Sequence, residues 1–194
     1  MGRIKELIRN DPVRKRQVEF CSYPLEGERL IVEGWFRDER LVGGYAWDGR
    51  PLPSGPAHLM CVRLLLGEWP LLVLDAEAEM IKVPHAMCIK AVESVKRIIG
   101  LRIVSGFGEE VFKRIGGTKG CTHLTHLIVA AGPAAVHGFW TFQMQEPRPL
   151  PNKLEEIEGI EFWINSCHVW EENGQLMKEI ESLFEKKHAQ KADM

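Results

Sequence analysis

The residues of this chain best suited to metal binding or nucleophilic chemistry are its five cysteines and seven histidines. One cysteine stands out among them. Cys121 follows a glycine-dense turn at 116–120 and precedes His123 and His126. This pattern predicts a sharp turn into a helix, and a helix start favours the thiolate form of a cysteine. Helix positions two apart diverge, so His123 shares a direction with Cys121 only if the chain is not yet helical there. A thiolate binds metal ions or attacks electrophiles, so we expect Cys121 to be central to function.

Thiolates and imidazoles from several segments are the ligands typical of zinc and iron–sulfur centres. The candidate ligands are His58 at the head of a predicted strand, Cys88 at a predicted helix start, and Cys121. His123 and Cys167 are the candidates for a fourth ligand. Imidazole combined with thiolates suits zinc best, so we predict zinc, with an iron–sulfur cluster as the next choice.

Most of these cysteines also have an ordinary structural explanation. A lone cysteine in a globular chain is more often a small buried hydrophobe than a ligand. We favour that explanation for Cys21 and Cys61, which lie inside predicted strands. Cys88 lies on the apolar stripe of its helix, and both Cys88 and Cys167 stay open between the two interpretations.

Composition argues against several classes of function. With 194 residues, 45% of them hydrophobic, the chain can bury the core of one domain. Its formal net charge of -2 gives no electrostatic reason to expect nucleic acid or an anionic membrane surface as partner. No apolar run approaches the roughly 18 residues of a spanning helix, and residues 1–6 lack the apolar core of a signal peptide. The odd, sparse cysteines argue against a disulfide framework, so we expect a cytoplasmic protein.

The elements that must position these residues begin with strands. Period-two alternation predicts strands over 16–23, 29–37, 41–47, 58–66 and 71–79. Asp38-Glu39 is predicted to form a tight connection between two of them, and 49–56, rich in proline and glycine, a loop.

Helical periodicity takes over after Pro84. We predict helices over 88–99, 109–115, 121–131, 134–143 and 175–188, with a kink or break at Gly132-Pro133. Residues 146–151 are predicted to be a linker and 161–169 a strand. Strands followed by helices indicate an α+β fold, an antiparallel sheet with helices packed on one face. We expect a single domain over 1–194, with an N-terminal strand extension at 13–50, a core at 56–145 and a C-terminal strand and helix at 152–188.

Across nearly its whole length the sequence resembles a bacterial family of unknown function, marked by a Gly-Cys-Thr-His-Leu motif. Its marks here are Ile31-Val32-Glu33-Gly34, Pro56-Ala57-His58-Leu59-Met60, Asp75-Ala76-Glu77-Ala78, Gly116-Gly117, Gly120-Cys121-Thr122-His123-Leu124 and Ser166-Cys167-His168. This resemblance implies relatives but no activity.

From about Pro56 to Gln145 the order of features is also similar to the NifU/IscU-type iron–sulfur cluster scaffolds and their zinc-binding SufU-like relatives. The matching positions are His58, Asp75-Ala76, Cys88, Ile99-Gly100 and Cys121. The resemblance implies an IscU-like fold with extra N-terminal strands and a metal site at His58, Cys88 and Cys121. The chain departs from that family at His58, where the scaffolds have a cysteine, and at Met60, where they have an aspartate.

We therefore predict a metal-binding protein, zinc or iron–sulfur, that serves as a scaffold or carrier in sulfur or metal metabolism. Its partners would be a sulfur donor, a metal-acceptor protein or a small-molecule ligand. One alternative is a small-molecule enzyme with a zinc- or thiolate-centred site at Cys121. The other is an assembly module with buried structural thiols, and the oligomeric state, a homo-oligomer included, is left open.

Overall fold

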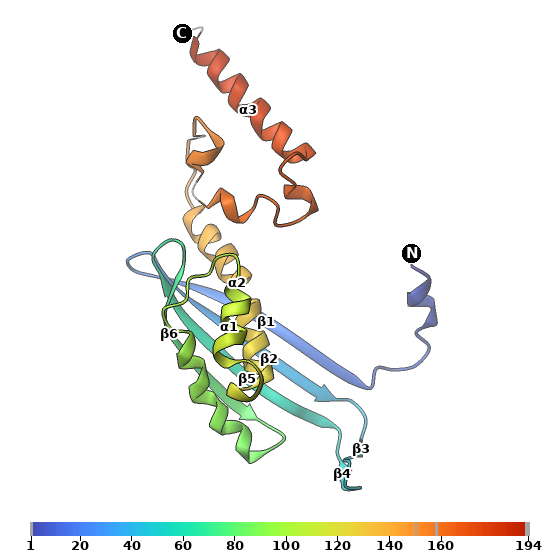
Figure 1. The fold of residues 1–194 in the computed structure, drawn as a ribbon. Coiled ribbons are helices and arrows are strands. Elements are labelled where there is room, and N and C mark those ends of the chain that lie inside the picture. The colour runs from blue at the N-terminus through green and yellow to red at the C-terminus, as the bar shows by residue number, and fades with distance from the viewer. Residues whose placement is uncertain (1, 150, 158, 193–194) are drawn as a thin grey trace. The chain divides into compact units, whose positions relative to one another are not determined.

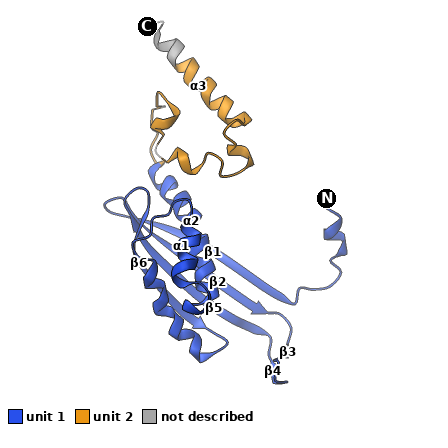
Figure 2. Cartoon of the chain, in the orientation of Figure 1, with its two compact units in different colours: residues 1–143 blue, residues 144–194 orange. Residues whose placement is uncertain are grey.

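The computed structural model describes residues 2–149, 151–157 and 159–192. The chain divides into two compact units, Met1–Gln143 and Met144–Met194, where the sequence predicted a single domain with subregions (Figure 2). The division falls just before the proline-rich stretch at 146–151 that was predicted to be a linker. In the described part of the chain, no helix has both the length and the apolar character needed to cross a membrane.

The first unit is built on a four-stranded antiparallel sheet in the order β1-β2-β5-β6. Its strands are β1 (Arg14–Leu25), β2 (Arg29–Arg40), β5 (Gly55–Gly67) and β6 (Leu72–Lys82). The predicted hairpin is confirmed, since β5 pairs with β6. The connection predicted at Asp38-Glu39 is wrong, because β2 continues through both residues to Arg40. The strand predicted over 41–47 shrinks to β3 (Gly44–Tyr45), which pairs with β4 (Pro51–Leu52) away from the main sheet.

Alternation along the strands separates a core face from an outer face. In β2, Leu30, Val32 and Phe36 are buried, while Glu33 and Trp35 between them are half-buried. The outer face is polar: Arg63 on β5 donates from Nε to Glu33 Oε2 at 2.6 Å. The alternation in the sequence therefore gives a sheet with one apolar face that packs in the core and one polar face on the outside.

Helices cover that core face, which confirms the predicted α+β class (Figure 1). They are η2 (Ala86–Ile98), α1 (Phe107–Ile115) and α2 (Thr122–Gln143), and the 3₁₀ turns η1 (Arg3–Leu7) and η3 (Gly117–Lys119) complete the unit. α2 lies across β1, β2 and β5, α1 packs against α2, and η2 packs against β6. The helix predicted over 88–99 is present in 3₁₀ form and begins two residues earlier.

α2 runs unbroken through Pro133, so the predicted kink or break into two helices is wrong. A proline costs a helix one N–H donor, which packing on both sides of it can offset. Here Gly132 and Ala135 are buried on either side. A Cβ on Gly132 would lie 3.0 Å from the ring of Phe107, so the glycine lets α1 approach α2 closely.

The described residues of the second unit form three 3₁₀ turns and a helix. These are η4 (Leu154–Glu156), η5 (Ile160–Phe162), η6 (His168–Trp170) and α3 (Gln175–Ala192). The strand predicted over 161–169 is wrong, whereas the predicted C-terminal helix is present. Asn165 adopts a positive φ of 61°, and Trp163 donates its backbone N–H to the carbonyl of Ile160, so this segment turns instead of extending.

Candidate functional site

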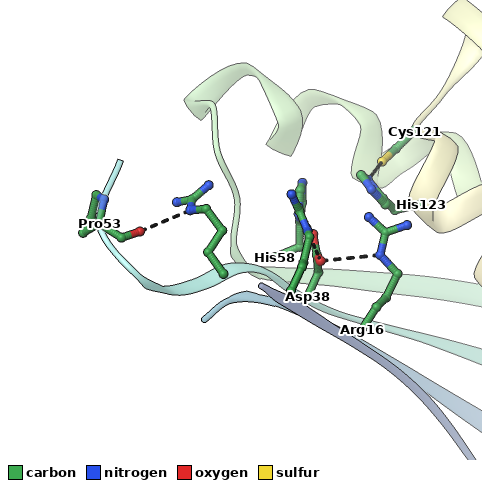
Figure 3. Close-up of polar contacts among 8 residues, drawn as sticks. Arg16, Asp38, Pro53, His58, Cys121 and His123 are labelled. Carbon is green, nitrogen blue, oxygen red and sulfur yellow. Dashed lines mark hydrogen bonds and ion pairs between the residues drawn. The ribbon is translucent and has the colours of Figure 1, made fainter. Parts of the chain in front are cut away.

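Polar side chains gather at one end of the sheet, under the start of α2 (Figure 3). The sheet-end cluster consists of Arg14, Arg16, Asp38, His58, Cys121 and His123. Strand register explains half of it: Asp38 on β2 pairs with Arg16 on β1 and with His58 on β5, so the three side chains share the core face. Arg14 comes from the first position of β1, and the start of α2 brings Cys121 and His123 over this end of the sheet.

Asp38 is a fully buried carboxylate held by three basic side chains. It accepts hydrogen bonds from Arg14 Nε at 2.7 Å, from Arg14 Nη2, from Arg16 Nε at 3.4 Å and from His58 Nδ1 at 3.0 Å. The Arg14 hydrogen bonds hold the pKa of Asp38 well below its usual range, although burial opposes this shift. Asp38 is therefore ionised at neutral pH, and a buried charge of this kind needs such partners.

His58 is oriented by this carboxylate. An ionised carboxylate only accepts hydrogen bonds, so Nδ1 of His58 carries the proton and Nε2 is the nitrogen left to act on a ligand. The side chain is 12% exposed, which leaves it within reach of a ligand while fixing its ring. A carboxylate-bound imidazole with one free nitrogen can serve as a metal ligand or as a base.

His123 packs directly on His58. Their ring centroids lie 4.3 Å apart, and the His123 ring also lies 5.0 Å from that of Phe36. Burial lowers the pKa of His123, and the neighbouring His58 and Arg16 side chains shift it in the same direction. His123 is therefore neutral at pH 7 and keeps an unprotonated ring nitrogen.

Cys121 stands immediately before α2, and its carbonyl oxygen accepts the backbone N–H of Thr125 at 2.9 Å. Because Cys121 is not itself helical, its Sγ lies 3.9 Å from Nδ1 of His123 despite the two-residue spacing. His126 points elsewhere: its Nδ1 donates to the carbonyl of Thr122 at 2.8 Å, and its ring contacts Phe112 edge-on. The thiol thus has one imidazole beside it and a second imidazole next to that one.

The structure brings together three of the five predicted ligands, His58, Cys121 and His123. Cys88 is half-buried on η2, and in the described residues no side-chain hydrogen bond joins it to the sheet-end cluster. Cys167 is exposed and belongs to the second unit. Among the described residues no three or more His, Cys, Asp or Glu side chains are already grouped to hold a metal ion. Metal ligation therefore stays a prediction.

Sequence reasoning missed the charged members of the cluster, Arg14, Arg16 and Asp38. A signal was present, because the alternation that puts Val32 and Phe36 on the core face puts Asp38 there as well. A carboxylate on a core face needs buried partners, and such partners often mark a site.

The chain belongs to the family described as Protein of unknown function (DUF2889), whose model matches residues 14–137. No curated protein and no solved structure matches the chain. The matched segment contains every residue of the sheet-end cluster and also Cys88, whereas Cys167 lies beyond it. The comparisons lend no support to the likeness with iron–sulfur scaffolds.

Proposed function

We propose that the sheet-end cluster binds a metal ion, zinc as the best fit, through Cys121 Sγ, His123 Nδ1 and His58 Nε2. The observation that carries this proposal is the hydrogen bond from His58 Nδ1 to the buried carboxylate of Asp38, 3.0 Å long. Histidines that ligate zinc usually donate their second ring N–H to such a partner, which orients the ring and strengthens it as a ligand. One thiolate with two imidazoles is a donor set that zinc accepts.

The spacing of the donor atoms supports the same assignment. Two groups bound tetrahedrally to one zinc ion, a sulfur at about 2.3 Å and a nitrogen at about 2.0 Å, lie roughly 3.5 Å apart. The 3.9 Å between Cys121 Sγ and His123 Nδ1 is close to this separation. The three donors are not yet aimed at one point, so binding requires the side chains at the start of α2 to rotate toward the His58 ring that Asp38 holds.

Three protein ligands leave a fourth position, which defines what the ion does. If Cys88, which the sequence predicts as one of the three main ligands, fills it, the site is structural or carries metal between partners. If it stays open, the ion can hold a thiolate or activate water. We propose a scaffold or carrier role in the cytoplasm, with an iron–sulfur cluster as the alternative cargo and a sulfur donor or metal acceptor as partner.

A second function is favoured by the contact between Cys121 and His123 alone. An imidazole beside a thiol can take the proton from Sγ, and the resulting thiolate attacks an electrophilic substrate. His123 is neutral at pH 7 because burial lowers its pKa, so its ring has a nitrogen free to accept that proton. In this alternative the protein is a small-molecule enzyme that needs no metal.

Metal analysis and an absorption spectrum of protein purified without oxygen separate these functions. The metal proposal expects close to one zinc ion per chain, or a cluster chromophore, that is lost in Cys121→Ser and in His58→Gln. Cys21→Ser, a half-buried cysteine on β1, is the matched control and should keep the metal.

Zinc retained by Cys121→Ser would refute this ligand assignment. Metal-free protein whose Cys121 reacts with iodoacetamide faster than Cys21, and slows in His123→Gln, would favour the enzyme. Metal-free protein with an unreactive Cys121 would leave only an assembly module.

A further inference from the structure

A hollow lies between η2 and the loop that leads to Cys121, and its volume is about 320 Å³. Lys90 and Arg97 of η2 and Lys119 of η3 line it, together with one carboxylate, Glu93. Three cations therefore face one anion, in a chain whose formal net charge is -2. The hollow is therefore positively charged although the whole chain carries a negative net charge. Its positive potential raises the concentration of anions near it.

Two of these cations are held in place by neutral groups. Arg97 Nη1 donates to the carbonyl of Lys119 at 2.9 Å, and Lys119 Nζ donates to the carbonyl of Lys113 at 2.7 Å. Across the described part of the chain, no ion pair joins Lys90, Arg97 or Lys119 to a carboxylate. Backbone carbonyls fix these side chains without cancelling their charge, so the charge remains for a ligand.

The wall of the hollow is closely packed at Gly120. A Cβ at this position would lie 2.6 Å from the carbonyl oxygen of Ile115 and 2.8 Å from Oγ of Ser94. Ser94 is buried on η2 and donates its hydroxyl to the carbonyl of Ala91. Only glycine lets the loop approach η2 this closely, so the cations from the two segments keep a fixed spacing.

We propose that this hollow binds a small anionic ligand through phosphate or carboxylate groups. Its volume is at the lower end of the range for small-molecule pockets, about 300–1,000 Å³, which suits a phosphate ester or a small polycarboxylate. Gly120 lines the hollow and Cys121 is the next residue, so the ligand would contact the segment that positions the candidate thiol. The proposal does not depend on whether the sheet-end cluster binds metal.

Isothermal titration calorimetry on the full chain at low salt tests this proposal, with inorganic phosphate, pyrophosphate and citrate as probes. We expect at least one probe to bind, and its identity separates phosphate from carboxylate recognition. Lys90→Glu should weaken binding by about tenfold or more, the usual value of one charge-assisted hydrogen bond. Lys15→Glu, on the exposed edge strand β1 at the other side of the sheet from β6 and η2, makes the same change of net charge and should alter affinity by less than about twofold.

The proposal fails if none of the three probes binds, or if Lys15→Glu weakens binding as much as Lys90→Glu does. Lys90 is exposed and forms no ion pair with the described residues, so its replacement should leave the thermal unfolding temperature unchanged. A second variant, Lys119→Gln, should weaken binding in the same direction. Cys121→Ser should keep the wild-type affinity, which separates this hollow from the sheet-end cluster.

Discussion

Replacing Asp38 by asparagine should destabilise the chain more than most single changes at a polar residue. The side chain is fully buried and accepts hydrogen bonds from Arg14, Arg16 and His58. Breaking a buried ion pair by removing one partner costs about 3–5 kcal/mol. Arg14 and Arg16 are 46% and 55% exposed, so water can solvate them again, and we expect the lower end, about 3 kcal/mol.

The pH dependence of this loss of stability tests whether the charge on Asp38 is its cause. The folded-state pKa of Asp38 lies well below the unfolded value, so the stabilisation is complete above the unfolded pKa and is lost as the pH falls. In the unfolded chain the pKa of Asp38 is about 3.9, so this carboxylate becomes protonated between pH 6 and pH 3. The free energy of unfolding of wild type therefore approaches that of Asp38→Asn by about 1 kcal/mol over this interval. The folded carboxylate stays ionised over this interval.

Urea unfolding followed by circular dichroism at both pH values measures these free energies. Asp75→Asn is the matched control, because Asp75 is an exposed partner of Lys96 and its loss should barely move the midpoint. A loss below about 1 kcal/mol in Asp38→Asn at pH 6, or a difference that widens toward pH 3, would refute the argument that a charged Asp38 organises this end of the sheet.

Two further predictions concern packing and the free thiols. Gly138→Ala should lower the free energy of unfolding by about 1–3 kcal/mol, because the added Cβ would lie 2.5 Å from Cβ of Ser22 and force α2 away from β1. A urea unfolding curve that matches wild type would contradict this close approach of α2 to β1. Iodoacetamide followed by mass spectrometry should label Cys167 first and Cys61 last. Cys167 is exposed and the backbone N–H groups of Trp170 and Val169 lower its pKa, whereas burial raises the pKa of Cys61 to about 12. Equal rates in folded protein would contradict this order, and Cys61 should react once urea unfolds the chain.

Much of the fold was predictable because the physical signals are local. Alternation in β2 and β5 and the apolar stripe of η2 place the sheet and its covering helix without knowledge of the rest of the chain. The errors arose where a local preference competes with packing or with one residue. Pro133 remains inside α2 because its neighbours are buried, and the positive φ of Asn165 turns a segment whose composition favours a strand.

The candidate site was predictable only in part for a similar reason. Cys121 and His123 are close in sequence, and their glycine turn marks them. Their meeting with His58 depends on how α2 crosses the sheet, which no local pattern specifies. Asp38 was missed because its importance follows from the pairing of β2 with β1 and β5, and the sequence alone does not specify that register.

Titration of the metal-free chain with cobalt(II) tests the central claim most directly, because a cobalt–thiolate bond produces a charge-transfer absorption band. Cobalt adopts the tetrahedral sites that zinc uses, so the band reports both binding and the thiolate ligand. The account predicts a band that saturates near one cobalt per chain in wild type and Cys21→Ser and is absent in Cys121→Ser. No band in wild type, or an unchanged band in Cys121→Ser, would contradict the claim.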